Sequence, residues 1–161
     1  MSKMRRFSIL PLVCLMAGPA LAQTMPDGCF TRTYAQAHLD QHPEQVVERI
    51  SILFGPYETL VTAEIKVLLA DQGHAGRDGF GGRRMSESAA NFTTPLQFGI
   101  ECDGGSFDVI ALDANGITIE TGYVRVASDG CGGDDSTSLA EAGSALTRYR
   151  LERSDLAACE W

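Results

Sequence analysis

The sequence predicts an all-β, mainly antiparallel fold: a small disulfide-stapled barrel or sandwich of about seven or eight strands with one or two short helices. Three observations predict it. Apolar and polar residues alternate with a period of two in several segments, turn residues separate these segments, and four cysteines remain beyond an N-terminal signal. The pattern does not distinguish a barrel from a sandwich.

Residues 1–22 have the order of a cleavable secretory signal peptide. The order comprises the bases Lys3, Arg5 and Arg6, then the apolar run 7–17, then the small-residue site Ala20-Leu21-Ala22. The apolar run is shorter than the roughly 20 residues of a membrane-spanning helix, and no later stretch reaches that length. We therefore expect one β-rich domain over residues 23–161, periplasmic or secreted after signal peptide cleavage, with no membrane span.

Cleavage of this signal leaves an acidic chain. The whole sequence holds 13 Lys and Arg against 21 Asp and Glu, and three of the bases lie in the signal, so residues 23–161 carry a net charge of −11. Such a balance repels the phosphates of nucleic acids. We expect no nucleic-acid partner, and instead an unknown protein or small ligand of the cell envelope.

The cysteines outside the signal are Cys29, Cys102, Cys131 and Cys159. Export and an even number favour two disulfides, for which three pairings are possible. We favour Cys29 with Cys159, because chain termini often lie close together at the surface, and Cys102 with Cys131. No Cys-x-x-Cys pair is present, so neither a zinc site nor thiol redox chemistry is indicated.

Alternation places the strands along the chain. In order, they are expected near Phe30–Tyr34, Val46–Phe54, Val61–Leu69, Leu96–Cys102, Phe107–Ala111, Ile117–Ile119, Val124–Val126 and Tyr149–Leu151. Turns are expected at Gly55-Pro56-Tyr57, Asp103-Gly104-Gly105 and Asn115-Gly116, and a β-bulge at Gly122. Short helices are expected at Gln36–Gln41, which ends near Pro43, and at Ser138–Ala145, which is rich in alanine.

The glycine- and arginine-rich segment 73–84 is the first candidate binding site. It places His74, Arg77, Phe80, Arg83 and Arg84 in a flexible loop of an otherwise acidic chain. Arginine forks suit carboxylates of a partner or ligand, and loops on a rigid sheet often carry recognition. The Gly-Lys-Ser/Thr ending of a phosphate-binding loop is absent, so nucleotide binding is not indicated. The alternative is a hairpin tip whose arginines lie near the protein's own acids.

No catalytic constellation is found, and no cofactor is expected. His38 and His42 have the spacing of two metal ligands on one helical face, but position 39 is a leucine, so the metalloprotease motif is incomplete. His74 could join them only through the fold. We expect Trp161, beside Cys159, to cover the end of the core.

The sequence thus favours an exported, soluble, non-enzymatic binding module of unknown ligand that uses loop 73–84 and the adjacent sheet surface. One alternative is a carrier that holds a small ligand in an interior barrel pocket. The other is a hydrolase or metal enzyme that uses His38, His42 or His74.

Overall fold

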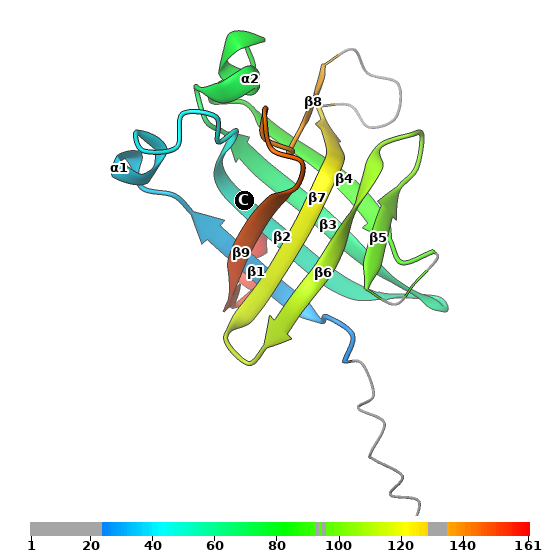
Figure 1. The fold of residues 1–161 in the computed structure, drawn as a ribbon. Helices are drawn as coiled ribbons and strands as arrows, with labels where there is room; N and C mark the ends of the chain where they lie inside the picture. Colours follow the sequence, from blue (N-terminus) through cyan, green and yellow to red (C-terminus); the bar gives the residue numbers. More distant parts are fainter. Residues whose placement is uncertain (1–23, 93, 95, 129–134) are drawn as a thin grey trace, which may run out of the picture.

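The computed structural model describes residues 24–92, 94, 96–128 and 135–161. It is a closed barrel of eight antiparallel strands with one additional strand, β8 (Figure 1). Of the two folds that the sequence left open, the structure is therefore the barrel. The strands are β1 (Gly28–Thr33), β2 (Val47–Tyr57), β3 (Leu60–Leu69), β4 (Arg84–Ala90), β5 (Gln97–Ile100), β6 (Gly105–Asp113), β7 (Gly116–Ala127), β8 (Ser136–Ser138) and β9 (Thr147–Ser154). The helical elements are α1 (Gln36–Leu39), α2 (Gly73–Arg77) and the 3₁₀ turn η1 (Leu156–Cys159).

Hydrogen bonding follows chain order around the barrel. Strands β1 to β7 each pair with the next, β7 then pairs with β9, and β9 pairs with β1 to close the sheet. Strand β8 pairs with the last residues of β7. The ladder between β4 and β5 is short, with only Ala89 and Ala90 of β4 paired. Beyond it, Ser86 of β4 pairs directly with Ala127 of β7, so the β5–β6 hairpin departs from the wall at this point.

Side chains fill the barrel interior. Phe54 is central, with its ring 5.8 Å from that of Phe30, 5.1 Å from Phe98 and 6.4 Å from Phe107. Phe98 and Phe107 stack at 5.2 Å. These four rings are at most 1% exposed and belong to one cluster with the inward aliphatic residues of β2, β3, β7 and β9. Aromatic pairs of this kind stabilise a core beyond the area that they bury.

The predicted hairpin of β2 and β3 is confirmed, but its predicted turn is wrong. Strand β2 continues through Gly55-Pro56-Tyr57, and the chain reverses at Glu58-Thr59, where Glu58 has φ of +53°. Proline is tolerated here because β1 begins at Gly28, opposite Phe54, which leaves this end of β2 with a neighbour on one side only. The predicted Asn115-Gly116 turn does join β6 to β7, and the Asp113 carboxylate accepts both N–H groups.

The helix expected at Ser138–Ala145 is wrong. The segment begins with the end of β8 and continues as turns and bends. Its backbone is held by side chains rather than by helical hydrogen bonds: the amide of Ala140 donates to the Ser138 hydroxyl, and that of Glu141 donates to the Thr147 hydroxyl. Gly143 has φ of +79°, which a helix does not allow. Local side-chain acceptors therefore outweigh alanine's helix propensity.

Strand β4 was not expected, because the alternation of its sequence is interrupted. Met85 and Ala89 point into the core, but Glu87 lies between them and also faces inward. Its carboxylate is 3.6 Å from the guanidinium of Arg125, and the two side chains are 10% and 14% exposed. A buried acid whose partner base lies far away in the sequence thus interrupts the apolar–polar alternation by which a strand is recognised.

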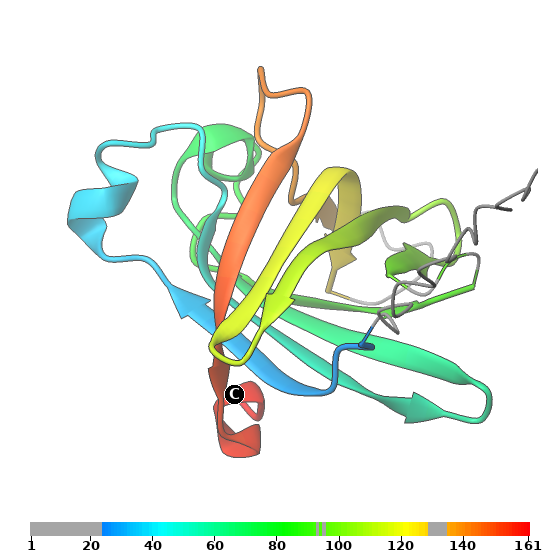
Figure 2. The ribbon, with the colours of Figure 1, turned by 60° about the horizontal axis from the view of Figure 1, so that its bottom comes forward.

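The predicted Cys29–Cys159 disulfide is confirmed. It joins β1 to η1, which lies outside the barrel wall beside β1 and β2 (Figure 2). The second predicted pair includes Cys131, which lies outside the described residues. No helix in the described part of the chain is long and apolar enough to cross a membrane.

We predict that a Cys29→Ala/Cys159→Ala variant of residues 23–161 loses about 2–5 kcal/mol of unfolding free energy. The bridge closes a loop with a sequence separation of 130 residues, which restricts the unfolded chain. Urea unfolding followed by circular dichroism measures the difference. Equal midpoints for the variant and the oxidised parent would contradict the prediction.

Candidate functional site

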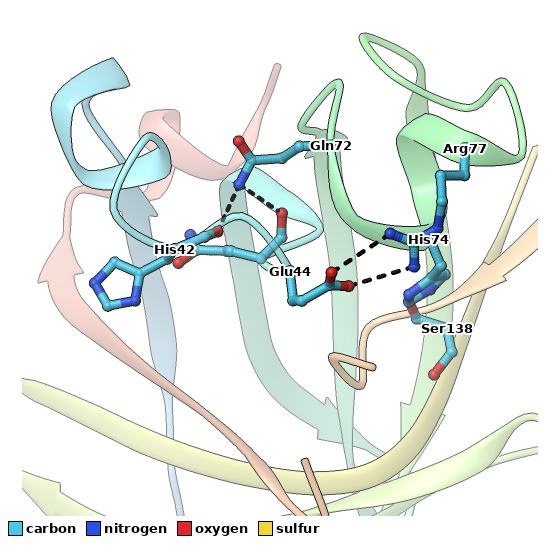
Figure 3. A network of polar contacts seen from close by, with 7 residues as sticks. His42, Glu44, Gln72, His74, Arg77 and Ser138 are labelled. Carbon is cyan, nitrogen blue, oxygen red and sulfur yellow. Dashed lines mark hydrogen bonds and ion pairs between the residues drawn. The ribbon is translucent and has the colours of Figure 1, made fainter. Parts of the chain in front are cut away.

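Three segments close one end of the barrel, which we call the loop end. They are residues 34–46 with α1, residues 70–83 with α2, and residues 136–146 with β8 (Figures 1 and 3). The predicted helix at Gln36–Gln41 is confirmed in its first four residues. Most of the sequence-predicted site residues gather at the loop end.

The glycine-rich segment is ordered by close packing. Gly73 begins α2 with φ of +59°, and a Cβ there would lie 2.8 Å from the carbonyl oxygen of Glu44. At Gly81, a Cβ would lie 2.3 Å from the Asp71 carboxylate. Glycine is therefore needed at both positions for the backbones to approach. The sequence suggested a flexible loop, whereas these contacts give a short helix and a tight return to β4.

Four of the five residues predicted in this loop contact the protein itself. Arg77 reaches both carboxylate oxygens of Glu44, at 3.5 and 3.3 Å, and Arg83 pairs with Asp135 at 2.9 Å. His74 Nε2 lies 3.0 Å from the carbonyl oxygen of Ser138, which fixes Nε2 as the donor (Figure 3). Phe80 packs against the core. The arginines thus lie near the protein's own acids, the alternative that the sequence left open.

Gln72 connects two of the closing segments. Its side-chain nitrogen lies 3.3, 2.7 and 3.1 Å from the carbonyl oxygens of Leu39, His42 and Gln45, so its two N–H groups are shared among three acceptors. Figure 3 shows Gln72 beside His42. These oxygens lie at the end of α1 and in the following turns, and those of Leu39 and His42 also accept backbone N–H groups, from His42 and Gln45. A single amide therefore fixes the path of the chain between α1 and β2.

The two histidines of α1 form a ring stack. His38 lies between Tyr34 and His42, with ring centroids 4.8 and 4.2 Å apart. His38 Nε2 is 2.9 Å from the side-chain oxygen of Gln45. Glu141 faces the stack, and its pKa is raised by burial, an effect that the two histidines partly offset. His74 bonds elsewhere, so the three histidines do not converge.

Arg84 differs from the other predicted residues. It begins β4 and lies on the outer wall of the barrel, with its guanidinium carbon 5.6 Å from the Trp161 ring. Trp161 donates its Nε1–H to the Ser51 hydroxyl on the outward face of β2. The expectation that Trp161 covers the end of the core is wrong, because the disulfide holds the preceding residues against the outside of the wall.

A second feature of the outer wall is an apolar hollow of about 300 Å³, which we call the outer groove. It lies over β3, β4 and β5 and the tip of the β2–β3 hairpin, and most of its lining residues on these strands alternate with the inward-facing ones. Its lining residues are Tyr57, Leu60, Thr62, Glu87, Ser88, Ala89, Ala90, Phe92, Gly99 and Glu101. Tyr57 is 63% exposed and Phe92 is 53% exposed. Large exposed aromatic side chains beside an apolar hollow are typical of binding surfaces.

Sequence reasoning did not identify the outer groove. Tyr57 was assigned to a turn, and Phe92 lies in a stretch with no periodic signal. Their proximity depends on the pairing of β3 with β4 and of β4 with β5, which brings residues 62, 90 and 99 side by side. No local pattern encodes such an adjacency.

Within the described residues, no group of three or more His, Cys, Asp and Glu side chains is arranged to hold a metal ion. Comparison with protein-family models, with curated proteins and with solved structures gives no match to this chain.

We predict that Gln72→Ala lowers the unfolding free energy by about 1–3 kcal/mol, because the hydrogen bonds of the side-chain amide to the turns after α1 are lost. Urea unfolding measures the loss, and hydrogen exchange of residues 36–46 should accelerate. Gln41→Ala is the matched control, since Gln41 is exposed and its side chain makes no hydrogen bond within the described residues. Equal stability of both variants would contradict the role assigned to Gln72.

We predict that Glu141→Gln becomes more stable relative to the parent as the pH rises from about 4 to about 7. The raised pKa means that the folded protein favours the neutral carboxyl, so ionisation at higher pH costs stability that the amide does not lose. Thermal unfolding of both proteins across this range measures the difference. A parent that gains stability over the variant with rising pH would contradict it.

Proposed function

We propose that this chain is an exported binding module without catalytic activity, which holds a protein partner on the outer wall of its barrel. The observation that carries the proposal is the outer groove, where Tyr57 and Phe92 expose their rings beside an apolar hollow of about 300 Å³. Support for export comes from the signal-like residues 1–22 and from the Cys29–Cys159 disulfide, a bond typical of oxidising compartments.

The position of the groove favours a protein partner over a small molecule. Small-ligand sites enclose most of the ligand surface, whereas this hollow lies on the outside of the barrel and is open along one side. A protein segment would cover the open side of the groove with its own surface. An aromatic or aliphatic side chain of that segment in the groove would be a buried anchor of the kind that dominates interface energies. Glu101, exposed at the rim, favours a lysine or arginine beside that anchor.

The two alternatives have less support. The four phenylalanine rings and their aliphatic neighbours occupy the barrel interior, where a carrier would need an empty pocket. A histidine enzyme would need its imidazoles to face one substrate, but His38 bonds to Gln45 and His74 bonds to Ser138. Loop 73–84 remains a second candidate surface, although its ion pairs would have to be exchanged for pairs with a partner.

A display library of random peptides tests the proposal. Peptides selected on oxidised residues 23–161 should bind a Tyr57→Ser/Phe92→Ser variant at least tenfold more weakly, because two central aromatic anchors are removed. Fluorescence anisotropy of labelled peptides measures the affinities. The selected peptides should share an apolar residue next to a basic one.

Two control variants locate the surface. Ile110→Ser removes another exposed apolar side chain, on β6 and outside the groove, and should leave affinity unchanged. Arg77→Ala/Arg83→Ala removes the two paired arginines of the loop end. Loss of binding in this last variant, with retention in the Tyr57→Ser/Phe92→Ser variant, would overturn the proposal and move the site to loop 73–84.

A further inference from the structure

The positive charges of the barrel are distributed unevenly. Of the ten Lys and Arg side chains in the described part of the chain, six form ion pairs with carboxylates. Three of the other four, Arg49, Lys66 and Arg84, lie on the outer wall around Trp161. No carboxylate of the described residues lies within ion-pair distance of these three. In a chain with 21 acids against 13 bases, such a cluster is unexpected.

The cluster is built on adjacent strands. Arg49 of β2, Lys66 of β3 and Arg84 of β4 face outward, because their neighbours Ile50, Val67 and Met85 face the core. The C-terminal segment fixes two of them from the other side. Arg49 donates to the carbonyl oxygen of residue 158 at 3.3 Å, and Lys66 Nζ donates to that of residue 159 at 3.0 Å.

Trp161 is held between two of the arginines. The guanidinium carbon of Arg49 is 4.2 Å from the ring centroid, and that of Arg84 is 5.6 Å away. The indole N–H donates to the hydroxyl of Ser51, a buried residue. Cation–π contacts with both arginines and this hydrogen bond fix the ring against the wall. The indole therefore forms a rigid side to any adjoining site.

An open hollow of about 180 Å³ adjoins this ring, and we call it the Trp161 hollow. Its lining residues are Lys66, Val67, Arg84, Met85, Ser86, Ala127, Ser128 and Trp161. At roughly 30 Å³ per water molecule, it holds about six waters, which is room for a phosphate or a carboxylate with a few attached atoms.

The hollow offers many unused donors. The Arg84 side chain makes no hydrogen bond within the described residues, so its five N–H groups are available, and Lys66 uses only one of its three. Ser86 and Ser128 are exposed and add two hydroxyls. A planar guanidinium beside an ammonium and hydroxyls suits the oxygens of an anionic group.

We infer that the Trp161 hollow is an anion-binding site, which holds a phosphate or carboxylate group of a ligand between Lys66 and Arg84, against the indole ring. The two anionic groups share the same recognition chemistry, and the experiment distinguishes them. The site is separate from the outer groove, so either can exist without the other.

Trp161 is the single tryptophan of the chain, so its fluorescence reports on the hollow directly. The oxidised protein, residues 23–161, is titrated with methyl phosphate and, separately, with acetate, each at an ionic strength held constant with sodium chloride. We expect at least one anion to change the Trp161 emission in a saturable way. The anion with the lower dissociation constant identifies the preferred group.

Arg84→Gln and Lys66→Gln should each raise the dissociation constant about tenfold, since each removes a charged hydrogen bond. Arg153→Gln is the matched control. Arg153 is the fourth base without an ion pair, and it donates to the carbonyl oxygen of Asp27, away from the Trp161 hollow. Its substitution therefore removes the same charge from another part of the surface. Its affinity should equal that of the parent.

Three outcomes would overturn the inference. The first is a Trp161 emission that changes with ionic strength alone, and the second is an emission that neither anion changes. The third is an equal dissociation constant for the parent and the Arg84→Gln variant. Circular dichroism and the thermal unfolding midpoint establish that each variant is folded. The Tyr57→Ser/Phe92→Ser variant should still respond to the anion, so failure of the outer groove and failure of the anion site are distinguishable.

Discussion

Closure of the sheet through β1 is the constraint on which the rest of the structure depends. This strand of six residues, the first of the chain, pairs with β2 on one side and with the last strand, β9, on the other. Phe30 enters the core from its inner face, and Cys29 extends from its outer face to Cys159. One short strand thus closes the barrel, fills part of its centre and attaches the C-terminal segment to the wall.

Because the barrel is closed and filled with side chains, the binding sites proposed above lie on its outer surface. A strand alternates between the two faces of the sheet, so the residues that fix the core also fix which residues point outward. On β3, the inward residues Ala63, Ile65 and Val67 place Thr62 in the outer groove and Lys66 at the Trp161 hollow. The packing that fills the interior therefore also gives the outer wall a fixed arrangement of side chains.

The sequence predicted what depends on local pattern. Alternation identified β2, β3, β6 and β7, and the position of cysteines near both ends predicted the Cys29–Cys159 bond, because each rests on residue type and order. The predictions from sequence were wrong or missing where contacts between residues far apart in the chain determine the local structure. The inward Glu87 makes sense only beside Arg125, and Ser138–Ala145 avoids a helix through the Thr147 and Tyr149 contacts. Arg84 was selected with its loop neighbours, but its surroundings come from β2, β3 and the C-terminal segment, which no local pattern brings together.

The spacing of the two surface features follows from β4. On this strand Ser86 lines the Trp161 hollow and residues 87–90 line the outer groove, with Ala90 about four residues, or roughly 13 Å, from Ser86. Ser88, which lines the groove next to the hollow, donates its hydroxyl to Glu64 of β3 at 2.7 Å and so fixes a negative charge there. A partner segment anchored in the groove and extended along β4 would therefore meet an acid near its second residue and the unpaired bases Lys66 and Arg84 near its fourth. A basic and then an acidic side chain at those positions would match the wall, whereas the reverse order would place like charges together. If the outer groove holds a protein segment as proposed, the wall would have a direction, and its order of charges would select among segments with the same apolar anchor.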